Sequence, residues 1–177
     1  SKWCADAQTK SLFISAFEGV TAELRVSDKD SNPPYKMHAA IVDYDSKLSP
    51  DAELQLAKAG HVEFLPSYGV RTYSDNLRLV WSFEAPVPLI SAEHAKKFLE
   101  IMRKKLKLLK WHAGLDTQAL GNPGQYYHIG VNWFPLNPGY RVPKIHLNLW
   151  AFEALGQTDL DMSGTEYRVP LEKVAEE

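Results

Sequence analysis

Residues 37–44, with the sequence MHAAIVDY, constrain the fold more than any other stretch of this chain. The run is short, apolar and partly β-branched, which predicts a buried strand. Its last two residues are Asp43 and Tyr44, and Asp45 follows directly. Since alternate residues of a strand point to one face, we expect both carboxylates on one side, with Cα atoms about 6.5–7 Å apart. Tyr44 then points to the other face, where it suits the core or, alternatively, a contact with a sugar.

Two carboxylates this close repel each other unless a positive group neutralises them. Mg²⁺ or Mn²⁺ is the usual neutralising group, because hard cations take carboxylate and phosphate oxygens as ligands. The alternative is a solvated turn in which an aspartate caps the next helix. From the repulsion alone, we expect that replacing Asp43 or Asp45 by alanine leaves the fold intact or slightly more stable.

Composition limits the remaining choices. A length of 177 residues suits one domain spanning 1–177, and 45% hydrophobic residues can build a sizeable core. With 20 Lys and Arg against 22 Asp and Glu, the net charge of −2 excludes a global positive field, so any nucleic-acid surface must be a local patch. The single cysteine, Cys4, excludes an internal disulfide and a multi-cysteine metal site.

Location and chain extent are expectations from the same data. No run of 18 apolar residues occurs, so we expect no membrane partner and a cytoplasmic protein. The chain lacks an initial Met and ends in EKVAEE, from which we expect a fragment of a longer protein.

Four segments between the acids and the middle of the chain have clear patterns. Ser49, Pro50 and Gly60 predict a helix over 49–60 with a cap at each end. In NLRLVWSFE, apolar residues alternate with others, which puts Arg78 on the face opposite Trp81. The predictions are a helix over 49–60, a strand over 61–67 broken at Pro66, a hairpin of 69–74 and 76–84 around a tight turn at Asp75-Asn76, and a connector over 85–89.

The stretch 91–110 is the clearest helix, with Ser91 as its cap and apolar residues at helical spacing. Its other face is basic: Lys96, Lys97, Arg103, Lys104, Lys105, Lys107 and Lys110. We expect short strands in the Gly- and Pro-rich region 111–144, a strand or short helix over 145–156, and order of undecided type over 11–26. The element order predicts an α+β or mixed α/β sandwich around one sheet.

Asp116 is a third acid that follows an apolar residue about seventy positions after the first pair. Two metal ions about 3.5–4 Å apart need a bridging carboxylate and further ligands, which three aspartates supply. Arg78 carries a planar guanidinium suited to gripping a triphosphate. The alternatives are a helix-capping Asp116 and an Arg78 paired at the surface.

This order of Asp-x-Asp strand, hairpin, helix and acid resembles the archaeo-eukaryotic primase superfamily, and more closely its phage- or plasmid-type primase–polymerases. AIVDYDS is similar to the first motif of that family and GLDTQ to the third. TYSDNLRLVW lies where the family has a Ser-x-His pattern, with Ser74 as a loose match and Arg78 in the place of the histidine. The resemblance covers residues 38–133, most of the chain.

The resemblance implies an RNA-recognition-motif-like sheet flanked by helices, and a DNA primase–polymerase that adds nucleotides to a 3′-hydroxyl. Asp43, Asp45 and Asp116 would be the catalytic residues and hold two Mg²⁺ or Mn²⁺ ions. The implied partners are nucleoside triphosphates, single-stranded or primed template DNA, and a helicase domain outside this fragment. Nucleotide contacts would come from Ser74, Arg78, Tyr126 and His128, and template contacts from Lys104 and Lys107.

Less specific readings remain beside these. Tyr126 and Tyr127 suit base or sugar stacking, or packing on the core, and the basic helix face suits template phosphates or plain solvation. A metal-dependent nuclease also clusters acids, although HVEFLPS lacks the Lys of the common Glu-x-Lys pattern. A non-catalytic single-strand-binding module would use the basic and aromatic residues without metal.

Overall fold

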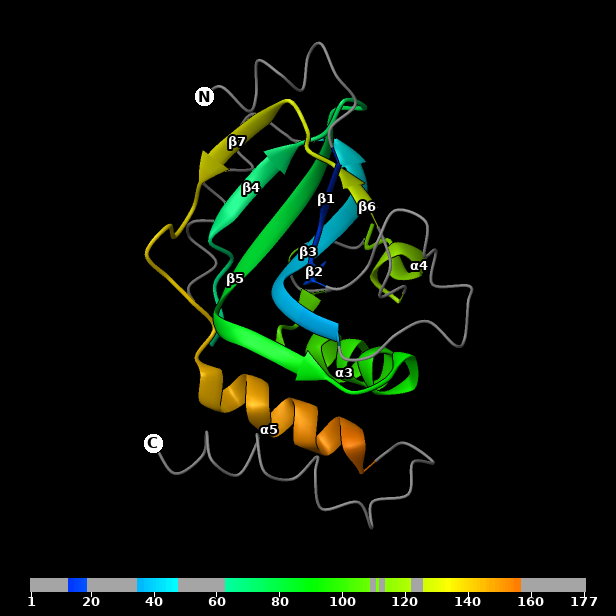
Figure 1. The fold of residues 1–177 in the computed structure, drawn as a ribbon. Helices are drawn as coiled ribbons and strands as arrows, with labels where there is room; N and C mark the ends of the chain where they lie inside the picture. Colours follow the sequence, from blue (N-terminus) through cyan, green and yellow to red (C-terminus); the bar gives the residue numbers. More distant parts are fainter. Residues whose placement is uncertain are drawn as a thin grey trace.

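The computed structural model describes residues 13–18, 35–47, 63–108, 111, 114–121 and 126–156 (Figure 1). The helix expected over 49–60 lies outside these residues. So do Leu109 and Lys110, with which the helix expected over 91–110 ends.

The fold is α+β, as the sequence predicts, and is built on one antiparallel sheet of five strands. A separate two-stranded sheet pairs β1 with β6. In spatial order the large sheet has β2 (Phe17–Glu18), β3 (Tyr35–Lys47), β5 (Asn76–Leu89), β4 (Tyr68–Arg71) and β7 (Asn132–Pro135); the small sheet has β1 (Phe13–Ser15) and β6 (Tyr126–His128); and the helices are α3 (Ala92–Lys105), α4 (Thr117–Leu120) and α5 (Lys144–Leu155).

The long pair of β3 and β5 forms the centre of the sheet and confirms the strand predicted over 37–44. Asp43 lies opposite Arg78, and Tyr44 opposite Leu77. Tyr44 and Trp81 are fully buried, and Arg78 on the other face is only 4% exposed. Both faces of the central strands are therefore covered near the acids, which an alternating pattern alone does not reveal.

The hairpin of β4 and β5 is confirmed, but its turn spans Thr72–Asp75 and Asn76 is already in the strand. Thr72 donates its N–H to the carbonyl of Asn76 (3.0 Å), and Asn76 donates its N–H to the hydroxyl of Thr72 (3.0 Å). Asp75 closes the turn with φ 63°, a left-handed conformation that Asp and Asn tolerate better than most residues.

Two predicted segments are wrong. Residues 85–89 are not a connector but the end of β5, where Pro88 still pairs with Lys36 of β3. β4 pairs only with Leu77–Val80 of β5. Proline has no N–H to donate, and beyond Val80 no hydrogen bond to β4 is required of β5, so prolines are tolerated there. Residues 63–67 form no strand, and two of their carbonyls accept from side chains: Phe64 O from Trp81 Nε1, and Pro66 O from Asn137 Nδ2.

The basic helix begins as predicted, with Ser91 accepting from the N–H of His94, but it ends at Lys105. Lys107 is left-handed (φ 51°), and this turn sends both Leu106 and Leu108 into the core. The segment of undecided type over 145–156 is helical in α5. In Figure 1, α5 lies at one end of the sheet, and the end of β3 with the start of β5 lies at the other.

His94 joins α3 to α5 inside the core, where it is fully buried. Its Nδ1 accepts the N–H of Ile90 (3.1 Å), so Nε2 carries the proton and donates to the carbonyl of Ala151 (2.7 Å). Burial lowers the pKa of His94, because a charged imidazole loses its hydration there. The neutral ring satisfies both backbone groups, and a second proton on Nδ1 would oppose the N–H of Ile90.

We therefore predict that His94 makes the fold sensitive to acid. Below the ordinary histidine pKa of 6.5 the unfolded chain gains a proton that the folded chain refuses, so the free energy of unfolding falls as pH decreases. Urea denaturation between pH 7.5 and 5 should show this fall, and His94→Gln should flatten it. His38→Gln, at an exposed position, is the control and should keep the slope.

Candidate acidic site

The structure brings Asp116 directly beside Asp43. The segment 114–116 runs antiparallel to the end of β3, with Tyr44 paired to Leu115. The N–H of Asp116 donates to the carbonyl of Asp43 (2.9 Å), and the N–H of Asp45 donates to the carbonyl of Gly114 (2.7 Å). Asp43 thus lies opposite Asp116, where cross-strand Cβ atoms are about 4.5–5.5 Å apart.

Asp45 stands where β3 departs from regular pairing. Tyr44 pairs with Leu77 but Lys47 pairs with Asn76, so β3 carries two additional residues, Asp45 and Ser46. Such bulges re-aim side chains and recur beside active sites. Asp45 is exposed while Asp43 is half-buried, and the carbonyl opposite Asp45 belongs to a glycine that has no side chain to crowd it.

Arg78 supplies the positive charge that the first acid requires. Its Nε and Nη2 donate to Oδ1 and Oδ2 of Asp43, the second bond measuring 3.1 Å. Its Nη1 donates to the carbonyl of His128 on β6. The guanidinium also lies 5.0 Å from the ring centre of Tyr127, a cation–π distance. A buried arginine thereby fixes the carboxylate of Asp43 through a two-pronged ion pair.

Tyr127 forms the apolar wall of this group and is 5% exposed, so its ring packs in the core. Burial raises its pKa, and the negative charges of Asp43 and Asp116 add to the rise, while Arg78 opposes it. The ring of Tyr127 thus lies against the guanidinium of Arg78, which in turn holds Asp43. Because its ring is buried, Tyr127 cannot stack on a base at the surface, and the core-packing alternative holds for it.

Asp116 is the N-cap of α4. Its Oδ1 accepts the N–H groups of Gln118 and Ala119, both at 3.0 Å. The capping alternative from the sequence thus holds, and it engages one of the two carboxylate oxygens.

The remaining predicted residues are spread more widely. Ser74 is exposed in the hairpin turn, and His128 is half-buried on β6, where Tyr126 also lies. Lys104 is exposed in the last turn of α3. The next residue, Lys105, pairs with Glu153 of α5 (3.9 Å). Lys107 lies next to Leu108, whose carbonyl accepts the hydroxyl of Tyr44 (2.9 Å) on the face of β3 opposite Asp43. The structure does not bring either lysine beside the acids.

The chemistry of the donor atoms decides whether these acids suit a pair of metal ions. In the described residues, no three Asp, Glu, His or Cys side chains are grouped as a metal site in their present rotamers. Each carboxylate oxygen has about two acceptor positions, so Asp43 keeps capacity beyond Arg78, as does Asp116 beyond its cap. Carboxylate oxygens are the ligands that Mg²⁺ and Mn²⁺ take, so Asp43, Asp45 and Asp116 are the side chains that would hold such an ion.

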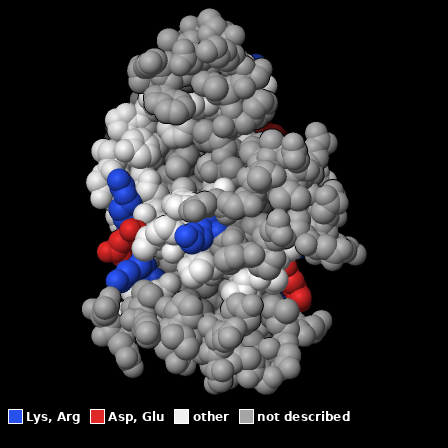
Figure 2. All heavy atoms as spheres, viewed as in Figure 1, with Lys and Arg blue, Asp and Glu red and all other residues white. Residues whose placement is uncertain are grey.

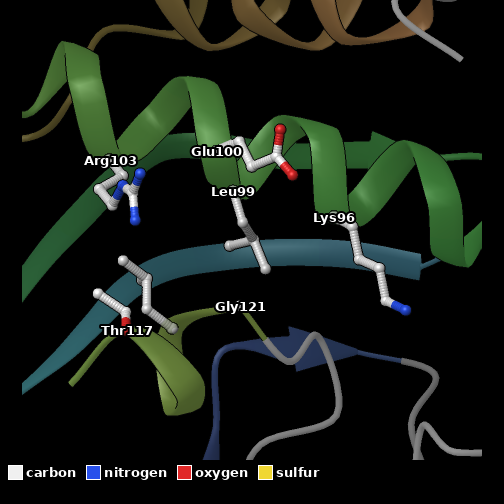
Figure 3. A pocket seen from close by; sticks show the side chains of 7 residues that line it. Lys96, Leu99, Glu100, Arg103, Thr117 and Gly121 are labelled. Atoms are coloured by element: carbon white, nitrogen blue, oxygen red, sulfur yellow. The ribbon is translucent and has the colours of Figure 1, made fainter.

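A small pocket lies between α3 and α4, the short helix that Asp116 caps (Figure 3). Figure 3 shows Arg103 reaching from α3 toward the side of Thr117. The lining residues are Lys96, Leu99, Glu100, Arg103, Thr117, Leu120 and Gly121. None of the three acids lines it, so it is not the nucleotide site that the sequence predicts.

Sequence reasoning missed Tyr73, a large aromatic residue in a polar turn, and the bulge at Asp45. Tyr73 has a signal in the sequence, since turns favour small polar residues. The bulge has none, because it arises from pairing with both Asn76 and Gly114.

Comparison of the chain with protein-family models, curated proteins and solved structures gave no match. No helix in the described part of the chain has the length and apolar character needed to cross a membrane.

On the face seen in Figure 2, the described Lys and Arg side chains lie singly or beside acidic ones and form no continuous basic surface.

The ion pair reverses the expectation that removing Asp43 is harmless. Asp43→Ala leaves the guanidinium of Arg78 buried without its counter-charge, so we predict a loss of about 3 kcal/mol in the free energy of unfolding. Urea denaturation measures it. The double variant Asp43→Leu with Arg78→Met should lose less than the two single changes together. Asp45→Ala, at an exposed position, is the control, and equal stability of both alanine variants would contradict the ion-pair account.

Proposed function

We propose that this chain is a nucleotidyltransferase of the primase–polymerase type, which extends a 3′-hydroxyl on a template using nucleoside triphosphates. The observation that carries the proposal is the backbone pairing of two distant segments at one end of the sheet, which sets Asp116 opposite Asp43 and Gly114 opposite Asp45. Two-metal phosphoryl transfer is a chemistry that requires several carboxylates near one another, and this pairing brings the backbone of the three aspartates to one place.

In this proposal each acid has a distinct part. When bound, two Mg²⁺ or Mn²⁺ ions supply the charge that activates the attacking hydroxyl and neutralises the triphosphate. Asp43, oriented by Arg78, is the fixed ligand, and Asp116, held by its capping bonds, is the second. Asp45 is the exposed ligand that turns inward. Positioning accounts for most of the rate, because the protein contributes little covalent chemistry.

We assign Arg78 a part beside the triphosphate contact that the resemblance implies. At 4% exposure, with Asp43 and the His128 carbonyl as partners, it orients an acid. Contact with a triphosphate by Arg78 or Ser74 stays a prediction. Ser74 is exposed on the turn that follows β4, at the same end of the sheet as the acids.

Asp45→Asn and Asp116→Asn test the proposal without disturbing the fold. Asn removes the charge at both positions, and at 116 it remains a good N-cap. We predict that either change lowers Mn²⁺-dependent extension of a primed template more than about 100-fold, with unchanged urea denaturation. Glu100→Gln, an exposed acid on α3, is the matched control and should leave extension unaffected.

The same assay separates the alternatives. A nuclease would shorten the labelled primer in the presence of Mn²⁺, and a single-strand-binding module would bind it without changing its length. Full extension by either Asn variant would remove that acid from the site.

A further inference from the structure

The tip of the β4–β5 hairpin combines an exposed aromatic ring with two cations. Tyr73 is 54% exposed, although it is a large aromatic side chain. Its ring packs against that of His128 with centroids 4.4 Å apart at 81°, so a neighbouring strand holds it in place. His128 in turn accepts from Arg78 through its carbonyl. Contacts therefore connect this ring to the group that fixes Asp43.

The two cations stand on either side of the turn. Arg71 ends β4, and Lys47 ends β3 opposite Asn76, two positions beyond Asp45. Both side chains are exposed, and Arg71 forms an ion pair with Asp75. The hydrogen bond from Arg71 lowers the pKa of Asp75, and the nearby charge of Lys47 adds to this effect. Asp75 is thus a charged carboxylate that partly neutralises the cations of the tip.

We propose that this hairpin tip binds a single nucleic-acid strand, with a base stacked on Tyr73 and phosphates paired with Lys47 and Arg71. An aromatic platform beside cations is the combination by which proteins hold single strands with little sequence preference. Because His128 already orients the ring, binding costs less side-chain entropy. This proposal rests on the proposed function, because a template or primer strand bound at the hairpin tip would lie near Asp45.

Asp75 sets the strength of this site. A phosphate must compete with its carboxylate for Arg71, so Asp75 weakens binding. Asp75→Asn removes the competing charge, and asparagine accepts the left-handed backbone (φ 63°) of that position. A gain in affinity from this change is the sharpest consequence of the proposal, because loss of a purely structural ion pair would give no gain.

The test is fluorescence anisotropy of a labelled single-stranded oligothymidine with the full chain, in EDTA and over a range of salt concentrations. We predict that Tyr73→Ala weakens binding about tenfold without changing the salt dependence, whereas Tyr73→Phe keeps the affinity. Lys47→Gln should reduce the slope of log K against log salt by about 0.7. Asp75→Asn should tighten binding and steepen the slope.

Phe152→Ala is the matched control for an exposed aromatic residue, since Phe152 on α5 is 51% exposed at the other end of the sheet. Unchanged affinity in Tyr73→Ala would overturn the proposal. So would a slope reduced by Lys104→Gln and not by Lys47→Gln, which would place the phosphates on α3. The binding assay contains no metal, so its results are independent of primer extension. Strand binding that depends on Tyr73 without any extension would contradict the proposed function alone. Extension together with unchanged strand affinity in Tyr73→Ala would contradict this binding site alone.

Discussion

The two-pronged ion pair between Asp43 and Arg78 is the interaction on which the arrangement of this molecule depends. It joins the two central strands, and through the carbonyl of His128 it ties the large sheet to β6. A buried guanidinium is costly unless every donor is satisfied, so β3, β5 and β6 must be in register together. The same bond holds a carboxylate at the end of the sheet where two further acids arrive.

The acidic site combines rigid and adjustable parts. Asp43 is fixed by Arg78, and Asp116 by the first turn of α4, while Asp45 is exposed in a bulge. Stability and proposed activity therefore make different demands on neighbouring residues that look alike in the sequence. Tyr44, between the two acids, anchors the strand by its buried bond to the Leu108 carbonyl. This bond also brings the chain that follows α3 back toward β3. Asp116 lies in that part of the chain and so comes to lie beside Asp43.

Several elements could be predicted from local pattern. The apolar run before Asp43, the alternation after Asn76 and the apolar periodicity after Ser91 each specify one element, because the period of burial follows from backbone geometry. The pattern failed where tertiary contacts override it. The side chains of Trp81 and Asn137 donate to the carbonyls of Phe64 and Pro66, and Pro88 is tolerated in β5 because β4 is short.

By itself, the sequence determined the α+β class, the buried strand before the acids and the candidacy of Asp43, Asp45 and Asp116, since these depend on residue type and spacing. Only the tertiary structure decided that Asp116 lies opposite Asp43, that Arg78 is buried on that acid, and that Tyr127 walls the group while Tyr73 stays outside. The physical reason is that pairing across seventy residues depends on how loops close and how strands slip in register. Neither quantity is written in any local stretch of the chain.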